Sequence, residues 1–335
     1  MKRNLIIAAA AVLAIAGTEA SAQNYPWKPD KPITLIVPWA AGGSTDQVSR
    51  VTAGEIEKAL GQKVVVVNQG GASGSIGTRN AMQAAPDGYT WTAGAAKDLG
   101  TYVVSGLLDT KINDWRLYLN VVNVSVLGVN NDTPYKSAQD VVNAMKAKPG
   151  QVSVATAGIN SSGHAAIEAF TRALGVTYKH VSYDGGNPAV IATVAGETEM
   201  TTQLAVEQAN MIRGKRLRAL AVLSDKPLEL EGYGTIPPIT SAVAGYKPDA
   251  NYFGIFVPKN VPAPVLQTLD MVWKDVVVNS EALKKYATAN GALFAPAYGD
   301  AAQKAVMPAI QTTAWQLQEG GKAKVSPDTV GIPKP

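Results

Sequence analysis

Residues 37–46 read VPWAAGGSTD and mark the point where the first predicted strand gives way to a helix. The preceding run ITLIVP (33–38) is apolar, as expected of a strand buried in a sheet. The residues that follow carry one apolar face at 3.6-residue spacing: Val48, Val51, Thr52, Ile56, Ala59 and Leu60. Gly61 stands where such a helix ends. A strand, a glycine-rich turn and a helix in this order predict an α/β protein.

The same alternation continues along the chain and predicts parallel sheets with helical crossovers. The predicted strands are 63–68, 89–94, 122–129, 151–158, 178–183, 216–224 and 251–258. The predicted helices include 137–147, one that carries Ala166 to Leu174, 185–196 with Asn187 as N-cap, 263–278, 281–289 and 300–319. The proline-containing segments 225–248 and 321–335 are predicted to be a connector and a loose tail.

The first residues have the composition of a targeting segment. Lys2 and Arg3 precede an apolar run over 5–16, and Ala20-Ser21-Ala22 has the pattern of a cleavage site. We therefore expect residues 1–22 to be a cleaved secretory signal peptide. The chain has no cysteine, and export without disulfides favours the bacterial periplasm.

Composition excludes several classes of function. The formal net charge of +4 and the lack of an Arg/Lys-rich stripe argue against a nucleic-acid partner. With no cysteine and two histidines, no Cys- or His-rich metal site is expected, and none is predicted. The loop GGASGSIG (70–77) lacks the G-x-G-x-x-G order of a dinucleotide site, so no cofactor is predicted. The sequence also lacks the G-x-S-x-G, P-loop and H-E-x-x-H patterns of common enzymes.

Two loops stand where a ligand of an open parallel sheet binds, after the carboxyl ends of strands. They are PWAAGGSTD (38–46) and ATAGINSSGH (155–164), and each leads into a helix. Both are rich in small and hydroxyl residues, and neither contains Lys or Arg. Because the N-terminus of a helix presents free N–H groups and a partial positive charge, such loops suit an anion. Their separation predicts a cleft between two lobes, with a carboxylate held at each side.

Structural roles compete with ligand contact at several of these positions. Ser44 with Gln47 fits a capping box, and Asp46 could complement the helix dipole or could accept from a ligand or an ordered water. For Trp39 we favour a wall of the cleft over a packed loop anchor. We expect His164, in a first helical turn, to be a neutral structural histidine, and His180 to pack inside its strand.

Two other functions remain open from the residues alone. A secreted hydrolase could use Ser161 as nucleophile and His164 as base, although it would need a third carboxylate and an oxyanion hole. A sensor or scaffold subunit that binds no ligand is the other alternative.

Nearly the whole chain after residue 22 resembles the periplasmic receptors of tripartite tricarboxylate transporters, also called Bug-type solute-binding proteins. The likeness is carried by ordered motifs. They are WKPDKPITLIVPWAAGGSTD, VVVVNQGGASGSIGTRNAMQAAPDGYT, VNNDTPYKSAQDVV, KPGQVSVATAGINSSGHAAIEAF, VTYKHVSYDGGNPAVIATVAGETEM, IRGKRLRALAVLS and NYFGIFVPKNVPAPVLQTL.

The resemblance implies a two-lobed α/β fold of the type II periplasmic-binding-protein kind, each lobe a mostly parallel sheet flanked by helices. We place one lobe at 23–122 plus 250–335 and the other at 123–249. The family further implies a periplasmic monomer without catalytic activity or cofactor. It closes around a small di- or tricarboxylate, aliphatic or aromatic, and delivers it to the membrane subunits of a transporter.

The family's first ligand loop falls on 39–46 and its second on 156–164, with further positions near 95–97, at 183–184 and at Gln203. The predicted ligand-binding residues are Trp39, Ala41, Gly42, Gly43, Ser44, Thr45, Asp46, Ala95, Thr156, Ala157, Asn160, Ser161, Ser162, His164, Tyr183 and Gln203. The chain departs from the family pattern at Asp184, where a Lys is common, in ETEMTTQLAVEQ (197–208), and after YTWTAG (89–94). It also has Trp39 where Phe or Tyr is common. These departures lie where ligand identity would be set.

Overall fold

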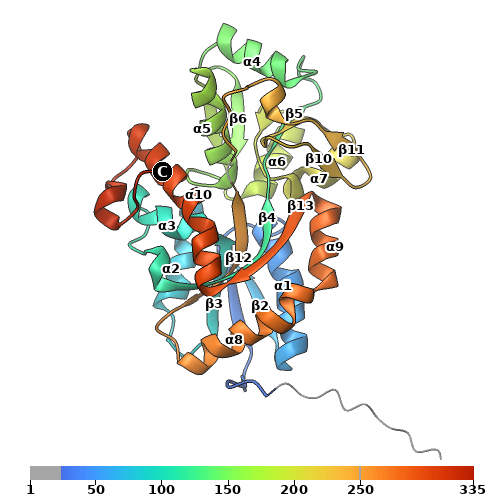
Figure 1. Cartoon of the computed structure of the whole chain (residues 1–335). Helices are drawn as coiled ribbons and strands as arrows, with labels where there is room; N and C mark the ends of the chain where they lie inside the picture. Colours follow the sequence, from blue (N-terminus) through green and yellow to red (C-terminus); the bar gives the residue numbers. More distant parts are fainter. Residues whose placement is uncertain (1–23, 249) are drawn as a thin grey trace, which may run out of the picture.

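The computed structural model describes residues 24–248 and 250–335, and it forms two α/β lobes that lie one above the other in Figure 1. The expected signal peptide at 1–22 lies outside the described residues. The two-lobed α/β fold class is confirmed, with helices on the faces of two separate sheets. Within the described residues, none of the helices is both long and apolar enough to cross a bilayer.

The larger lobe is built on a sheet whose strand order is β13-β4-β12-β3-β1-β2. Its strands are β1 (Ile33–Val37), β2 (Val64–Asn68), β3 (Thr90–Ala95), β4 (Trp115–Asn123), β12 (Asn251–Pro258) and β13 (Ala292–Tyr298). β1 pairs in parallel with both β2 and β3, whereas β12 and β13 run antiparallel to their neighbours. β4 therefore shares the direction of β1, β2 and β3, and most strands of this sheet run the same way.

Helices cover both faces of this sheet because its strands are apolar on both sides. Leu35 and Ile36 are adjacent on β1, point to opposite faces and belong to two different core clusters. Trp273 is fully buried in the first cluster and Ile310 in the second. The helices of this lobe are α1 (Ser44–Leu60), α2 (Ser75–Gln83), α3 (Ala96–Ser105), α8 (Ala263–Asp275), α9 (Glu281–Asn290) and α10 (Gly299–Glu319).

The smaller lobe has a sheet of strand order β7-β6-β8-β5-β9. Its strands are β5 (Val126–Asn130), β6 (Ser153–Thr156), β7 (Lys179–Ser182), β8 (Met200–Thr201) and β9 (Leu217–Val222). β6 pairs in parallel with β7 and β8, and β5 is antiparallel to β8 and β9. The flanking helices are α4 (Ala138–Ala147), α5 (Ser162–Leu174), α6 (Gly186–Val194) and α7 (Ala205–Arg213).

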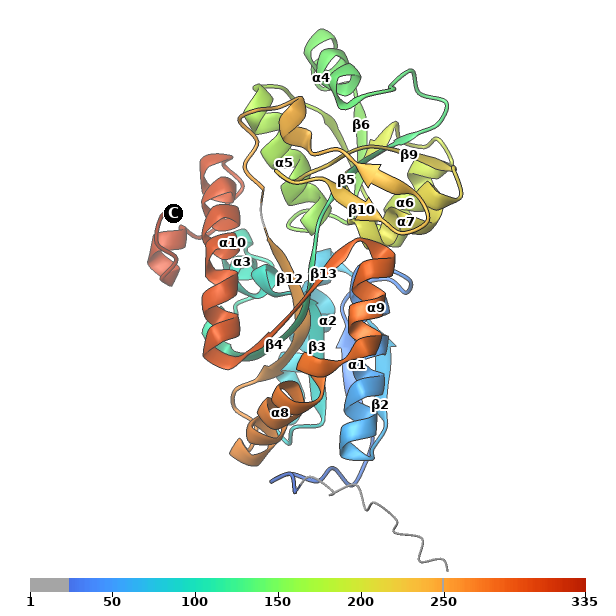
Figure 2. The same ribbon diagram turned by 45° about the vertical axis from the view of Figure 1, so that its right-hand side comes forward.

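The chain passes between the lobes along two neighbouring segments, which run upward side by side in Figures 1 and 2. One leads from β4 to β5 through Val124 and Ser125, and the other leads into β12. Asn251 of β12 pairs with Asn123 of β4, so the two segments are joined by sheet pairing at the lobe boundary. The predicted single strand at 122–129 is wrong, because its two halves belong to different sheets. The lobe boundaries at 123 and 249 stay a prediction.

Four other details differ from the sequence expectations. The connector 225–248 contains a hairpin of β10 (Leu228–Leu230) and β11 (Gly234–Ile236) and the short turn η3 (Ile239–Ser241). α3, α7, β13 and most of β4 were not predicted. α6 has Gly185 as its N-cap, so Asn187 lies inside the helix. The tail is not loose: it forms η5 (Pro327–Val330), and the carbonyl of Ile332 accepts from Trp315 Nε1 at 3.1 Å.

Candidate functional site

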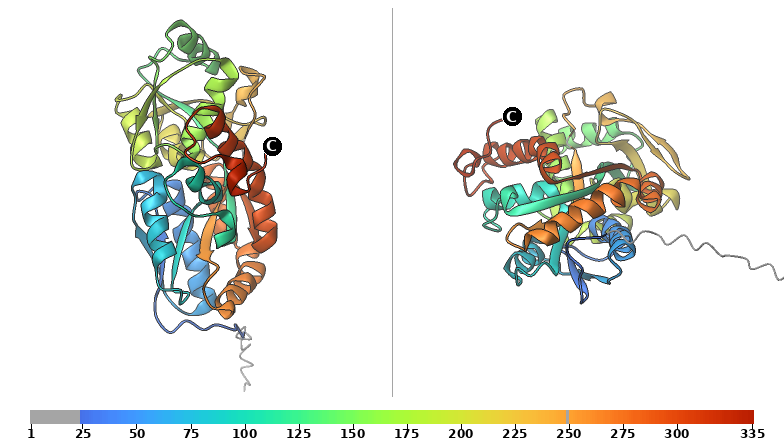
Figure 3. Two further views of the ribbon diagram at one scale, coloured as in Figure 1. Left: turned by 90° about the vertical axis from the view of Figure 1, so that its left-hand side faces the viewer. Right: turned by 60° about the horizontal axis from the view of Figure 1, so that its bottom comes forward.

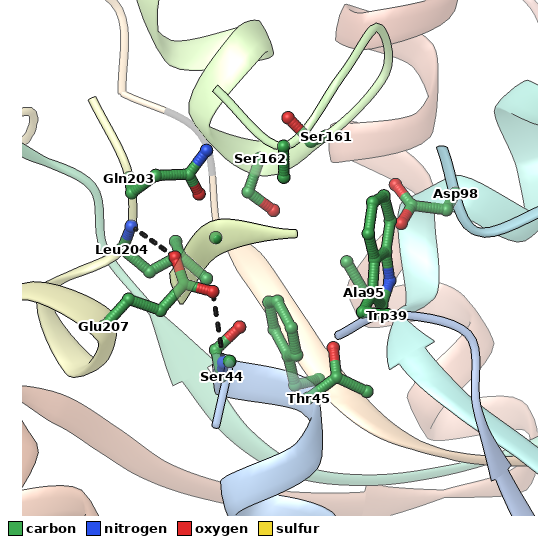
Figure 4. Close-up of a pocket in the computed structure, with 14 residues that line it drawn as sticks. Trp39, Ser44, Thr45, Ala95, Asp98, Ser161, Ser162, Gln203, Leu204 and Glu207 are labelled. Carbon is green, nitrogen blue, oxygen red and sulfur yellow. Dashed lines mark hydrogen bonds between the residues drawn. The ribbon is translucent and has the colours of Figure 1, made fainter. Parts of the chain in front are cut away.

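A pocket lies between the lobes, and loops of both contribute to it (Figure 4). With the lobes in this arrangement its cavity volume is about 30 Å³, well below the roughly 300–1,000 Å³ of typical ligand pockets. Its lining residues are Trp39, Gly43, Ser44, Thr45, Ala95, Asp98, Ala157, Ser161, Ser162, Gly186, Gln203, Leu204, Glu207 and Phe253.

Five helices begin at this pocket. Gly43, Ala95, Ser161 and Leu204 are the N-caps of α1, α3, α5 and α7, and Gly186 is the first residue of α6. First-turn N–H groups lack partners within their own helix, and each helix N-terminus carries roughly half a positive charge. Among the described residues that line the pocket, none is Lys or Arg. Any positive charge that the lining offers to a ligand therefore comes from backbone N–H groups rather than from cationic side chains.

Asp46 shapes the first loop instead of lining the pocket. Its carboxylate accepts from the amide of Gly42 at 3.0 Å, from Arg50 at 2.8 Å and from Asn68 at 3.0 Å. Burial raises the pKa of Asp46, but these hydrogen bonds outweigh it and hold the pKa below its usual value. Asp46 therefore complements the dipole of α1, as expected, and also fixes the conformation of the first loop. Gly42 itself adopts φ +79° and turns the chain into α1.

Ser44 is not the N-cap of α1. That position belongs to Gly43, and Ser44 is the first helical residue, so the capping-box interpretation is wrong. Gln47 instead donates through Nε2 to the carbonyl of Gly42 at 2.8 Å. Ser44 and Thr45 both line the pocket, and Trp39 forms one wall, where Figure 4 shows its indole beside Asp98.

The second loop is divided between the pocket and the lobe interior. Ala157, Ser161 and Ser162 line the pocket. Thr156 is fully buried, and its Oγ1 lies 2.6 Å from His180 Nε2. Asn160, at φ +71°, is also buried away from the pocket.

Asn160 joins the two lobes. Its Nδ2 donates to Ser105 Oγ at 2.6 Å, and its carbonyl accepts from Lys97 Nζ at 3.2 Å. Both partners lie on α3 in the larger lobe. The strained backbone of Asn160 is thus held by contacts that exist only when the lobes are together.

His164 does not face the pocket. Its Nε2 lies 3.7 Å from Glu168 Oε1, and its ring centroid lies 4.9 Å from that of His180. Burial lowers the pKa of His164 to about 3, so the imidazole is neutral at pH 7, as expected. The hydroxyl of Ser161 accepts from the backbone amide of His164 at 3.2 Å, which makes Ser161 a helix cap. This arrangement does not provide the Ser–His contact that a hydrolase requires.

Of the other predicted residues, Ala95 and Gln203 line the pocket, whereas Ala41 and Tyr183 do not. Ala41 is exposed at the tip of the first loop. Tyr183 donates its hydroxyl to Glu197 at 3.0 Å. The structure thus brings nine of the predicted residues to one pocket: Trp39, Gly43, Ser44, Thr45, Ala95, Ala157, Ser161, Ser162 and Gln203.

Glu207, on α7, is a lining residue that sequence reasoning missed. Its Oε1 accepts from the Ser44 amide at 3.1 Å and its Oε2 from the Leu204 amide at 3.2 Å. The side-chain oxygen and nitrogen of Gln203 have complementary partners when the amide group is rotated by 180°. In that orientation Gln203 donates to Glu207 Oε2 at 2.9 Å and accepts from the Ala157 amide at 2.7 Å. Burial raises the pKa of Glu207, although the N–H donors favour its ionised form. A carboxylate of one lobe therefore lies at the N-terminus of a helix of the other.

Asp98, in the first turn of α3, was also missed. Its side chain is buried, and burial raises its pKa to about 6. Lys97 Nζ lies 3.6 Å from its Oδ1. Asp98 and Glu207 both lie in stretches where the chain departs from the family pattern. That departure is the feature of the sequence from which the two residues could have been identified as pocket residues.

The remaining missed lining residues are Gly186, Leu204 and Phe253, which have no polar side chain to draw attention in a sequence. Within the described part of the chain, no group of three or more His, Cys, Asp or Glu is placed to hold a metal ion.

Comparison with known proteins gives a consistent result. The model of the family described as the tripartite tricarboxylate transporter family receptor matches residues 48–317. A Pseudomonas sp. (strain P51) protein, the UPF0065 protein in the tcbD-tcbE intergenic region, is 31% identical over 271 residues, 79% of each chain. Protein BugT of Bordetella pertussis (strain Tohama I) is 29% identical over 321 residues, which cover 92% of this chain and 95% of BugT.

Solved structures agree with the fold. The periplasmic binding protein BugD superposes with a TM-score of 0.80 at 25% identity, over 88% of this chain and 99% of BugD. Rhodopseudomonas palustris MatC with bound malate gives a TM-score of 0.75 at 23% identity over 87% and 98% of the two chains. R. palustris Rpa4515 with adipate gives 0.77 at 23% identity over 88% and 98%.

Proposed function

The chain belongs to the tripartite tricarboxylate transporter receptor family, and from this premise we propose that it captures a small organic carboxylate between its lobes. We further propose that it works in the periplasm after loss of residues 1–22 and hands its ligand to membrane subunits of a transporter. It acts by binding alone, without catalysis.

The main observation in favour of a carboxylate ligand is that five helix N-termini converge on one pocket, whose described lining has no cationic side chain. Such a pocket stabilises an anion through N–H groups that need no reorganisation. The solved relatives named with malate and adipate contain acids of this class, which supports the proposal.

We place the ligand carboxylate at the start of α5 and α6 in the smaller lobe. There Ser161, Ser162 and Gly186 line the pocket. Each charge-assisted hydrogen bond contributes roughly 1.5–3 kcal/mol. Two or three of them, with burial against Trp39 and Phe253, offset much of an association cost of roughly 4–15 kcal/mol.

A thermal-shift screen followed by calorimetry tests this function. Mono-, di- and tricarboxylates at millimolar concentration should raise the melting temperature, because a ligand at 100 times its Kd stabilises the folded state by about 2.7 kcal/mol. If an uncharged solute raises the melting temperature and no carboxylate does, the proposal is wrong. Turnover of an ester panel by concentrated protein would contradict the absence of catalysis.

A matched pair of glycine variants locates the site. In Gly186→Ala, the added Cβ would lie 2.1 Å from Glu207 Oε1, so ligand affinity should fall at least tenfold. Gly245→Ala, where no atom lies within 4 Å of the new Cβ, should bind as the wild type does. Melting of both apo-proteins checks that the first variant remains folded.

A further inference from the structure

Glu207 fills an anion position that a ligand would otherwise use. The Ser44 N–H at the start of α1 donates to Glu207 Oε1 at 3.1 Å, across the gap between the lobes. Gln203 and the Leu204 amide donate to the other oxygen. Three N–H donors favour the ionised carboxylate. A second ligand carboxylate placed against α1 would therefore meet carboxyl oxygens that the chain itself supplies.

Asp98, on the other side of the pocket, has a carboxylate oxygen without a hydrogen-bond partner among the described residues. Figure 4 shows Glu207 and Asp98 on opposite sides, with Ser161 and Ser162 between them. Asp98 is only 5% exposed, and the oxygen concerned is its Oδ1. An unsatisfied buried acceptor costs about 1–3 kcal/mol. A ligand that brings an N–H donor to this oxygen would recover that free energy.

The neighbouring cation does not remove this requirement. Lys97 Nζ forms an ion pair with Asp98 Oδ1 at 3.6 Å, a distance too long for a hydrogen bond, and donates to the carbonyl of Asn160 at 3.2 Å. The described lining of the pocket thus contains two acids and no base. Juxtaposed like charges cost several kcal/mol in a desolvated site, so a dianion that reaches both sides would be disfavoured.

The anion-binding end that remains is in the smaller lobe. The N-termini of α5 and α6 present Ser162 and Gly186 to the pocket, and neither helix has an acidic residue in its first turn. α3 and α7, by contrast, carry Asp98 and Glu207 in theirs. The charge of the pocket is therefore unevenly distributed. The start of α5 and α6 suits an anion, and the two sides formed by Asp98 and Glu207 suit a cation.

We propose that the ligand is a small amino-carboxylate, whose carboxylate lies at the start of α5 and α6 and whose ammonium group faces Asp98 and Glu207. This inference rests on the proposed function, because it assumes that the pocket holds a carboxylate. It narrows the ligand class from small carboxylates in general to those that also carry a protonated nitrogen.

Calorimetry with matched acids tests the ligand class. The probes are ω-amino acids from β-alanine to 6-aminohexanoate, the α-amino acids alanine, leucine and aspartate, and the diacids from malonate to adipate. We expect the tightest amino acid to bind at least tenfold more tightly than the tightest diacid. A diacid that binds more tightly than every amino acid overturns the inference and leaves the proposed function intact. If no amino acid binds, the inference fails, and the proposed function fails with it only if no acid of the thermal-shift screen binds either.

Conservative variants tie the preference to the two acids. Glu207→Gln and Asp98→Asn should each weaken amino-acid binding at least tenfold without weakening diacid binding. Glu229→Gln, an exposed acid on β10, is the matched control and should change neither. An amino-acid to diacid affinity ratio that stays unchanged in both pocket variants overturns the inference. Melting of each apo-protein shows whether the variant is folded. If neither pocket variant folds, the affinities of the wild type for amino acids and diacids decide whether the inference holds.

Discussion

A carboxylate fits at residue 207 because residue 186 is a glycine. Any Cβ at Gly186 would lie 2.1–2.2 Å from the carboxyl atoms of Glu207, so the two positions depend on each other. The same close approach brings Oε1 within 3.1 Å of the Ser44 amide. One side chain thus determines both the charge of the pocket and one of the contacts between the lobes.

His164 should make the protein sensitive to acid. Its pKa is lowered from 6.5 to about 3 by burial, whereas an unfolded histidine titrates near 6.5. Between these pH values the unfolded chain binds more protons, so stability rises with pH and is lost on acidification. From pH 6.5 to 5 this one group should cost about 2 kcal/mol. In urea unfolding at pH 7 and pH 5, His164→Gln should lose less stability than the wild type.

The environment of His164 contains groups that modulate this loss. His180 is partly buried with a lowered pKa, caused first by burial and then by Lys322, so it acts in the same direction. Burial raises the pKa of Glu168, but hydrogen bonds from Tyr178 and Lys322 lower it overall, so the stability that this carboxylate contributes is lost only at a pH below the two that are compared. Equal losses in the His164→Gln variant and the wild type would show that His180, and not His164, dominates.

At this scale, the sequence predicted the two loops but not which side chains face the ligand pocket. Small and hydroxyl residues after strands identified Ser44, Thr45, Ser161 and Ser162, because strand ends and helix starts are local features. Whether Thr156 faces the pocket or His180 depends on packing between elements. Glu207 is distant in sequence from Ser44, and no local pattern could pair them.

Among the elements, β12 has the most demanding position, since it lies between β3 and β4 and also leads from one lobe to the other. Its pairing with β4 shifts register between Phe253 and Gly254. A Cβ at Gly254 would lie 2.2 Å from the Tyr118 carbonyl oxygen. Backbone packs against backbone here, so no side chain can move to make room.

Gly254→Ala should therefore destabilise the protein by about 3 kcal/mol or more, through overpacking. Gly54→Ala is the matched control, because Gly54 lies inside α1 and has no atom within 4 Å of its new Cβ. The control should be stabilised by about 0.5–1 kcal/mol. Chemical denaturation of both variants measures the difference. Similar stability of the two would mean that β12 shifts to accommodate the methyl group.

Elements were predictable where their apolar pattern is strong and ends at a glycine or proline. β1, α1 and α5 are of this kind. β4 and β5 were merged because Asn123 and Ser125 alternate with valines in VNVSVLGV (122–129), as in one continuous strand, and a pattern of residues does not reveal that the chain changes sheet. β13 was missed because Pro296 lies within it, which sequence reasoning takes as a sign against a strand, although an edge strand tolerates it.

The whole molecule is in a form with its lobes in contact. The C-terminal end of α10 reaches the smaller lobe, as the left view of Figure 3 shows. There Arg172 of α5 pairs with Glu319 at 2.9 Å, and Lys322 pairs with Glu168 at 3.0 Å. These surface pairs are each worth about 0–1 kcal/mol, small enough for opening to remain accessible.

Reversal of one charge should shift this balance. In Arg172→Glu, two carboxylates would oppose each other across the lobe boundary, and we expect a larger radius of gyration in small-angle scattering of the apo-protein. Ligand affinity should weaken several-fold, because a smaller fraction of molecules is in the binding-competent form. Lys148→Glu, an exposed reversal at the end of α4, is the control and should change neither quantity. An unchanged radius for Arg172→Glu would contradict hinge closure at this boundary.

The place of β12 in the larger sheet has a consequence for biosynthesis. All strands of the smaller sheet come from one continuous stretch, β5 to β9, whereas the larger sheet needs β12 and β13 from the end of the chain. Because the proposed export delivers the chain N-terminus first, the smaller lobe can acquire its own core while the larger lobe still has an open position between β3 and β4. Until residue 258 emerges, both borders of that position are unpaired strand edges, the kind of surface that chaperones shield from aggregation.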